Sequence, residues 1–97
     1  MSAYAVGFCR IRDASWRKSY LERTMKLVEK HSGRFLVRLD CPWEVLEGKP
    51  PHSTGMVMIK FPSMEEARAW YNDPDYQPLI KLRQSGSTLD LILVESL

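Results

Sequence analysis

The sequence has few cysteines, no long apolar run and no marked excess of charge of one sign. Two cysteines in 97 residues, Cys9 and Cys41, are too few for a disulfide framework and lack the paired spacing of a zinc site. We interpret both as reduced thiols. No stretch approaches the roughly 18 apolar residues of a membrane span. The start, Met1 to Tyr4, lacks the basic and apolar regions of a signal peptide, so the cytoplasm is the expected location.

The charge balance also argues against a dedicated nucleic-acid binder. The 14 basic and 12 acidic side chains give a formal net charge of +2, whereas such proteins gather basic charge on one face. The chain also lacks the aromatic pattern of an RNA-recognition strand. With 44% hydrophobic and 27% charged residues, we expect one globular domain over residues 1–97. So short a chain buries a modest core, which favours a homo-oligomer.

Hydrophobic periodicity predicts an alternation of strands and helices. Spacing by two predicts strands, and spacing by three and four predicts helices. The expected strands are Tyr4–Arg12, Arg34–Asp40, a short Trp43–Glu47, Met56–Phe61 and Thr88–Glu95. The expected helices run from a cap at Asp13 or Ser15 to His31, from a cap at Ser63 to Tyr71, and over Tyr76–Gln84. This order is that of an α+β, ferredoxin-like βαββαβ sandwich with one extra short strand.

The predicted sheet has one face for the helices and one left open. On the first strand Ala5, Gly7 and Cys9 share a small, apolar side, while Tyr4, Val6 and Phe8 lie opposite. Helices cover only one face, and so many apolar side chains would not stay in water on the other. We therefore expect two copies to pack sheet to sheet as a homodimer.

Charged residues on the open face predict a small-molecule pocket. Arg10, Arg38 and Lys60 fall on three strands, and guanidinium groups bind carboxylate, enolate or phosphate groups. We place the pocket between sheet and helices, with these charges projecting into or around the space between subunits. The predicted ligand-binding residues are Tyr4, Phe8, Arg10, Arg38, Met58, Lys60 and Tyr76. The alternative is that these charges form ion pairs at the rim, with Glu44, Asp90 or Glu95.

Other side chains are open to a catalytic or a structural interpretation. His52, in a Gly/Pro-rich loop, is the candidate general base, while His31 suits a helix C-terminus as a cation. Neither has a partner at metal-ligand spacing, so we expect no metal and no cofactor. Trp70 fits the core, and Tyr76 could either tie down its turn or reach the pocket.

Three stretches carry a resemblance to a known family. They are Gly33–Arg38 with Glu44–Gly48; Phe61–Glu65 with Ala67–Tyr71; and Asp73–Gln77 with Leu82–Arg83 and Leu91–Glu95. In this order they resemble the domain-of-unknown-function family 1330 of the dimeric α+β barrel superfamily, over nearly the whole chain. The resemblance implies a ferredoxin-like subunit that pairs its sheet with that of a second copy. It implies no established activity, although the wider superfamily includes monooxygenases that need no metal or flavin.

Two stretches of the sequence depart from the pattern of the family that it resembles. The stretch Pro50–Gly55 lacks the arginine that often precedes the strand leading to the Phe-Pro-Ser motif, and the first strand carries Arg10 and Arg12. The pocket is therefore expected to be more cationic than in relatives. Two functions stay open: a cofactor-independent enzyme acting on a small carboxylated compound, or a non-catalytic ligand-binding or stress-related module.

Overall fold

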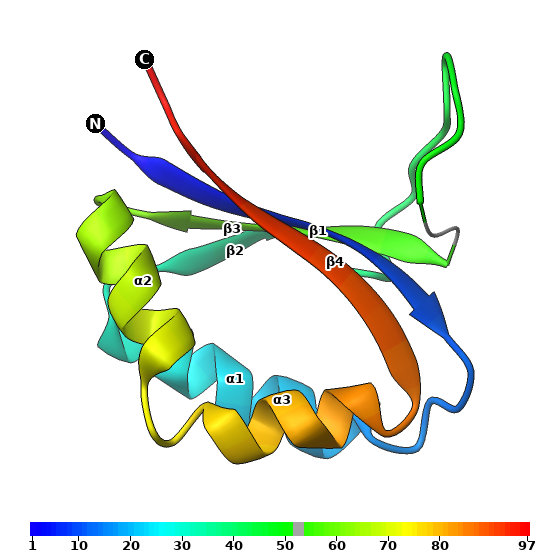
Figure 1. The fold of residues 1–97 in the computed structure, drawn as a ribbon, viewed down its shortest axis with the longest axis horizontal. Helices are drawn as coiled ribbons and strands as arrows, with labels where there is room; N and C mark the ends of the chain where they lie inside the picture. The colour runs from blue at the N-terminus through cyan, green and yellow to red at the C-terminus, as the bar shows by residue number, and fades with distance from the viewer. Residues whose placement is uncertain (52–53) are drawn as a thin grey trace.

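A computed structural model describes residues 1–51 and 54–97 of the chain, and its strands form one antiparallel sheet with the helices on one side (Figure 1). The strands are β1 (Ala3–Ile11), β2 (Arg34–Val37), β3 (Gly55–Phe61) and β4 (Ser87–Glu95). The helices are α1 (Arg17–Lys30), α2 (Met64–Asn72) and α3 (Gln77–Gln84). In the described part the sheet order is β2-β3-β1-β4, which confirms the ferredoxin-like α+β prediction.

The prediction of an extra strand over Trp43–Glu47 is wrong. Residues 38–50 form no strand: the first of them stay beside the sheet, and residues 45–50 rise away from it as an arm (Figure 1). A strand needs a neighbouring backbone to accept and donate its hydrogen bonds, and residues 43–47 pair with no strand of the described chain. Leu46 is 90% exposed as a result. The predicted strand Arg34–Asp40 likewise ends early, at Val37.

Small residues on β1 bring the sheet close to the helices. Burial alternates along the strand: Ala5, Gly7 and Cys9 are buried toward the helices, as predicted, and Ala3 is buried on the same side. Larger side chains fill the layer between sheet and helices, and Phe61, Trp70 and Tyr76 are each no more than 2% exposed. Aromatic contacts link them, with 5.3 Å between the ring centres of Phe61 and Trp70. This core fixes the distance between sheet and helices.

The start of α2 follows the sequence prediction, whereas the start of α1 does not. The Ser63 side chain accepts a hydrogen bond from the Glu66 backbone N–H at 3.1 Å, which caps α2. At α1 neither Asp13 nor Ser15 caps the helix: Asp13 accepts from the Ser15 N–H in a local turn, and Trp16 takes the cap position. Trp16 is buried edge-on against Tyr20, so packing of its ring sets the helix start.

The end of α1 is tied to the turn before α3. The Asp73 carboxylate accepts a hydrogen bond from Lys30 Nζ at 2.9 Å and lies 2.8 Å from His31 Nε2. It also accepts from the Asp75 backbone N–H. These bonds hold the pKa of Asp73 well below its usual range, with His31 the largest influence. His31 at the end of α1 thus lies against a specific acidic side chain.

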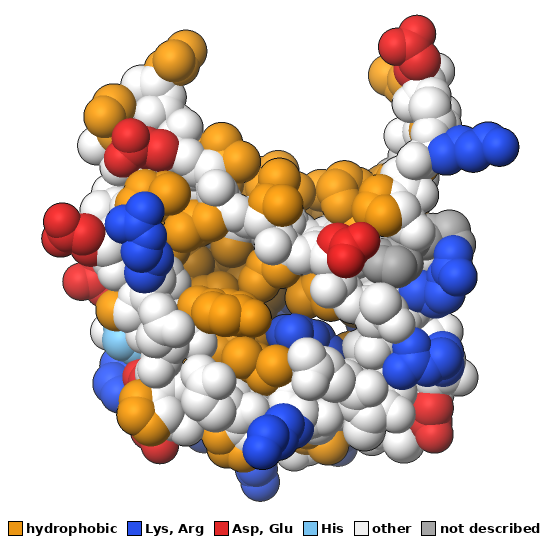
Figure 2. All heavy atoms as spheres, viewed as in Figure 1, with side chains coloured by type: hydrophobic (Ala, Val, Ile, Leu, Met, Phe, Trp, Pro, Cys, Tyr) orange, Lys and Arg blue, Asp and Glu red, His pale blue; other side chains and the backbone are white. Residues whose placement is uncertain are grey.

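The face of the sheet away from the helices carries apolar side chains. Figure 2 shows hydrophobic groups along this upper edge of the molecule, between the arm and the two chain ends. Cross-strand register places Tyr4 opposite Lys60 and Val94, and Val6 opposite Met58 and Ile92. Ile92 and Val94 are 56% and 46% exposed. Here this surface is called the open face.

Candidate functional site

A cleft opens between the sheet and the helices. It has a volume of about 90 Å³. Figure 2 shows a hollow here, surrounded by hydrophobic side chains with basic groups beside it. The walls are mainly apolar and aromatic, and its polar groups come from α1, α3 and the segment after β2. The lining residues are Cys9, Trp16, Arg17, Tyr20, Leu21, Phe35, Arg38, Leu39, Asp40, Val57, Ile59, Trp70, Tyr76, Arg83, Leu89 and Leu91.

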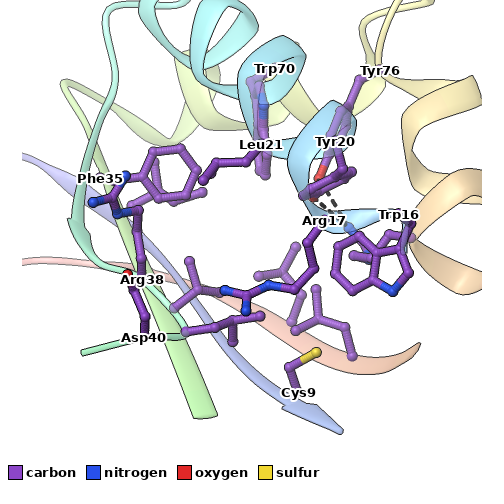
Figure 3. A pocket seen from close by; sticks show the side chains of 16 residues that line it. Cys9, Trp16, Arg17, Tyr20, Leu21, Phe35, Arg38, Asp40, Trp70 and Tyr76 are labelled. Atoms are coloured by element: carbon purple, nitrogen blue, oxygen red, sulfur yellow. Dashed lines mark hydrogen bonds between the residues drawn. The ribbon is translucent and has the colours of Figure 1, made fainter. Parts of the chain in front are cut away.

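Arg38 reaches the cleft because β2 contains an irregularity. Phe35 pairs with Ile59, but Val37 pairs with the adjacent Met58, so Leu36 is an extra residue in the strand. Such a bulge reverses the direction of the side chains that follow it. The prediction that Arg38 lies on the face away from the helices is therefore wrong, and its side chain lines the cleft beside Phe35 (Figure 3).

A buried arginine from α3 forms the polar end of the cleft. Arg83 is 6% exposed, and its Nη1 donates to Tyr76 Oη at 3.0 Å and to Tyr20 Oη at 3.1 Å. The two phenol oxygens lie 2.6 Å apart (Figure 3). Within residues 1–51 and 54–97, no carboxylate forms an ion pair with Arg83. The cleft therefore contains a buried positive charge without an acidic partner from the described chain.

The surroundings keep Arg83 charged and Tyr76 neutral. Burial acts to lower the pKa of Arg83, but the oxygens of Tyr20 and Tyr76 outweigh it and hold that pKa above its usual value. Burial, followed by the neighbouring Tyr20, raises the pKa of Tyr76 well above its usual range. The Tyr76 phenol thus keeps its proton at any physiological pH.

Several N–H donors of the lining lack acceptors. In the part of the chain that the structure describes, Trp16 Nε1, Trp70 Nε1 and Arg83 Nε are buried without a hydrogen-bond partner. A buried donor without an acceptor is costly, since it has lost its water. Arg17 adds a further cation: it extends from α1 across the cleft (Figure 3). Asp40 contributes the acidic group of the lining. The unpaired N–H donors and the positive charges of the lining together favour an anionic ligand.

Cys9 lines the cleft as an unreactive thiol. It is 1% exposed on the helix side of β1, as predicted, and burial raises its pKa above the ordinary value. A raised pKa leaves little thiolate, which is the nucleophilic form. Both cysteines are free thiols, as expected from the sequence. Among the described residues, no group of three His, Cys, Asp or Glu side chains is placed to hold a metal ion.

The structure separates the predicted ligand-binding residues into two sets. Arg38 and Tyr76 line the cleft. The others lie on the open face, on β1 or β3: the register places Tyr4 opposite Lys60, and Phe8, Arg10 and Met58 share that side of the sheet. The catalytic candidate His52 lies outside the described residues.

Sequence reasoning missed four charged or phenolic residues of the cleft, namely Arg17, Tyr20, Asp40 and Arg83. One signal was present for Arg83: it continues the buried stripe of Tyr76, Leu79 and Ile80 at helical spacing. Because arginine is seldom fully buried unless it is paired, an arginine on an otherwise apolar helix stripe is a candidate for a specific role. Tyr20 lies on the matching stripe of α1, where its ring alone gave no such signal.

Comparison with protein-family models identifies the family of this chain. The family model of the domain of unknown function DUF1330 matches residues 2–97. The chain belongs to this family. As a DUF1330 protein it has relatives of undetermined activity, and no curated protein matches its sequence. The described part of this DUF1330 chain contains no helix that is long and apolar enough to cross a membrane.

Solved structures share its fold at low sequence identity. A protein of unknown function from Rhodopseudomonas palustris is 17% identical with a TM-score of 0.77, over 99% of this chain and 82% of that one. SnoaB, a cofactor-independent oxygenase from Streptomyces nogalater, is 12% identical with a TM-score of 0.66, over 99% and 93%. A dimeric ferredoxin-like protein of unknown function from Thermobifida fusca is 10% identical with a TM-score of 0.55, over 99% and 92%. Identities this low establish the fold alone.

Proposed function

We propose that this DUF1330 protein is a homodimer that binds a small aromatic carboxylate in the cleft between sheet and helices. The observation that carries the proposal is Arg83, a charged guanidinium that is 6% exposed and has no acidic partner in the described chain. Buried charges in proteins are normally paired, because an unpaired one costs several kcal/mol. An anionic ligand supplies the missing charge.

The walls of the cleft support an aromatic body for this ligand. Trp16, Phe35 and Trp70 line it with aliphatic side chains between them. A cleft of about 90 Å³ is smaller than the roughly 150 Å³ of a cavity that encloses benzene. It therefore suits the acidic end of the ligand and part of one ring, with the remainder at the cleft mouth or in space released by a movement of Arg17.

The open face supports the homodimer. It carries Val6, Met58, Ile92 and Val94 beside one another, and a second copy would remove them from water. One structural neighbour is itself described as dimeric. In this arrangement Tyr4, Phe8, Arg10, Met58 and Lys60 line the subunit interface, and the cleft of each subunit lies on the other side of the sheet.

Calorimetric titration with benzoate tests the ligand proposal. We expect Arg83→Met to weaken benzoate binding about 10- to 150-fold, because a hydrogen bond to a charged group contributes roughly 1.5–3 kcal/mol. Arg38→Ala should also weaken it. The matched control is Arg10→Met, which removes an arginine from the open face and should leave the affinity unchanged.

The outcomes distinguish a ligand site in the cleft from a ligand site on the open face. Equal affinity of Arg83→Met and the unaltered protein would remove the cleft as the binding site, and a loss with Arg10→Met alone would place the ligand on the open face. Light scattering should give about twice the 11.3 kDa mass of one chain for every variant. A stable monomer at micromolar concentration would contradict the homodimer.

A second function, cofactor-independent oxygenation of the bound compound, is favoured by the fold shared with SnoaB. Proton transfer in such a reaction would fall to side chains of the cleft and to the substrate itself. Oxygen uptake that depends on both protein and an electron-rich aromatic acid would support it. Binding without oxygen uptake across a panel of such acids would leave the protein a non-catalytic ligand-binding module.

A further inference from the structure

The two phenols and the arginine at the polar end of the cleft form a hydrogen-bond network with one proton to spare. Tyr20 Oη and Tyr76 Oη lie 2.6 Å apart, a distance at which one phenol donates to the other. Arg83 Nη1 donates to both oxygens. Two phenols carry two hydroxyl protons, and the shared bond uses one. The second hydroxyl proton therefore points to an acceptor outside the network.

Burial decides which phenol has the spare proton. Tyr76 is 1% exposed, and Tyr20 Oη lies within hydrogen-bond distance as the acceptor for its O–H. A buried hydroxyl needs an acceptor, so Tyr76 donates to Tyr20. Tyr20 is only half-buried and lines the cleft, where a ligand or water can accept its proton. The high pKa of Tyr76 agrees with this direction, since Tyr76 keeps the proton that it donates.

The network makes Tyr20 a strengthened donor. Its oxygen accepts hydrogen bonds from both Arg83 and Tyr76, and hydrogen bonds in a chain polarise one another. Packing holds the ring in place: Trp16 lies edge-on to Tyr20 with 5.3 Å between ring centres, and Trp70 lies 4.7 Å from Tyr76. Figure 3 shows Tyr20 and Tyr76 together at one end of the cleft, between Trp70 and Trp16.

We infer that the Tyr20 hydroxyl donates a hydrogen bond to the anionic oxygen of the ligand, with Tyr76 and Arg83 as the residues that position and polarise it. The inference rests on the proposed ligand site in the cleft and adds the donor to the anion. Nη1 of Arg83 is already engaged by the phenols, while Arg83 Nε and the indole N–H groups of Trp16 and Trp70 have no partner in the described chain. The Tyr20 hydroxyl is the donor that the network polarises beside the buried positive charge, and it can serve one oxygen of a carboxylate or the single oxygen of a phenolate.

The test uses 4-nitrophenol, because its phenolate is coloured and its neutral form is not. We expect the unaltered protein to bind the phenolate in preference to the neutral phenol, so that binding increases phenolate absorbance near the probe's own pKa. Tyr20→Phe should weaken phenolate binding about 10- to 100-fold and abolish this increase. Tyr76→Phe should cause a smaller loss of the same kind, because Arg83 still polarises Tyr20. The matched control is Tyr71→Phe, an exposed tyrosine of α2 outside the cleft lining.

Parallel titrations with benzoate distinguish failure of this inference from failure of the ligand site. If Arg83→Met weakens binding of both probes and Tyr20→Phe leaves the phenolate absorbance unchanged, the cleft binds anions but Tyr20 is not the donor. If neither probe binds the unaltered protein, both the ligand site and the donor are wrong. If Tyr71→Phe loses the absorbance increase as Tyr20→Phe does, the loss is an effect of helix packing. That result would also overturn the role of Tyr20. Thermal unfolding of each variant shows whether it is folded during the titration.

Discussion

Replacing Ile92 on the open face with threonine should weaken the proposed dimer without weakening the subunit. Ile92 is 56% exposed in the single chain and lies opposite Val6 in the sheet. Threonine keeps the β-branched shape that suits a strand but replaces part of the apolar surface with a hydroxyl. The substitution therefore acts on the contact between copies.

The expected loss follows from the exposed area. Fully burying an isoleucine side chain contributes about 1.5–3 kcal/mol, and roughly half of this remains available for a subunit contact. A two-fold symmetric interface contains the residue twice. Ile92→Thr should therefore cost about 1.5 to 3 kcal/mol of association, which is about a 10- to 150-fold weaker dimer.

Sedimentation equilibrium over a range of concentrations measures this association constant. The matched control is Ala69→Ser, an exposed position on α2 away from the open face, for which we expect an unchanged constant. Urea unfolding should show that the isolated subunit is no less stable in Ile92→Thr. An association constant equal to that of the unaltered protein would refute the sheet-to-sheet arrangement, because no such interface could leave Ile92 in water.

Two further predictions concern the stability of the subunit. Gly33→Ala should destabilise it by about 1–3 kcal/mol in urea unfolding, because an added Cβ would lie 2.5 Å from Phe61 Cε1 in the core; unchanged stability would mean that Phe61 moves freely. Stability should also fall as pH drops below about 4, since the folded-state pKa of Asp73 lies below its ordinary 3.8 and the advantage of its charged form is lost as pH falls through the folded value. Asp73→Asn should flatten this acid limb, and an unaltered slope would refute the role of Asp73.

Much of the fold could be predicted because its signals are local. Alternation along β1 correctly placed Cys9 toward the helices, and the serine at position 63 with Glu66 three residues later correctly predicted the start of α2. Trp43–Glu47 has a strand-like composition, but whether a strand forms depends on a neighbouring edge, which composition does not encode. Trp16 replaced the predicted cap of α1 for a similar reason: packing of its ring on Tyr20 is a tertiary contact.

The site was less predictable because its residues depend on contacts that are distant in sequence. Alternation placed Arg38 on the wrong face, since one extra residue at Leu36 reverses every side chain that follows. Tyr20 and Arg83 are 63 residues apart and meet only when α1 and α3 pack side by side. A hydrophobic pattern encodes neither the bulge in β2 nor the packing of α1 against α3.

The cleft itself has its origin in the small side chains of β1. A Cβ at Gly7 would lie 2.9 Å from both Leu89 Cδ1 and Val57 Cγ1, which are cleft-lining residues of the two neighbouring strands. Larger residues on this strand would fill the space between sheet and helices that the aromatic core holds open. The same strand presents larger side chains, Tyr4 and Phe8, to the open face. One strand thus leaves room for a ligand on one side of the sheet and supplies apolar surface for a second copy on the other, so substitutions on either face should affect ligand binding and association separately.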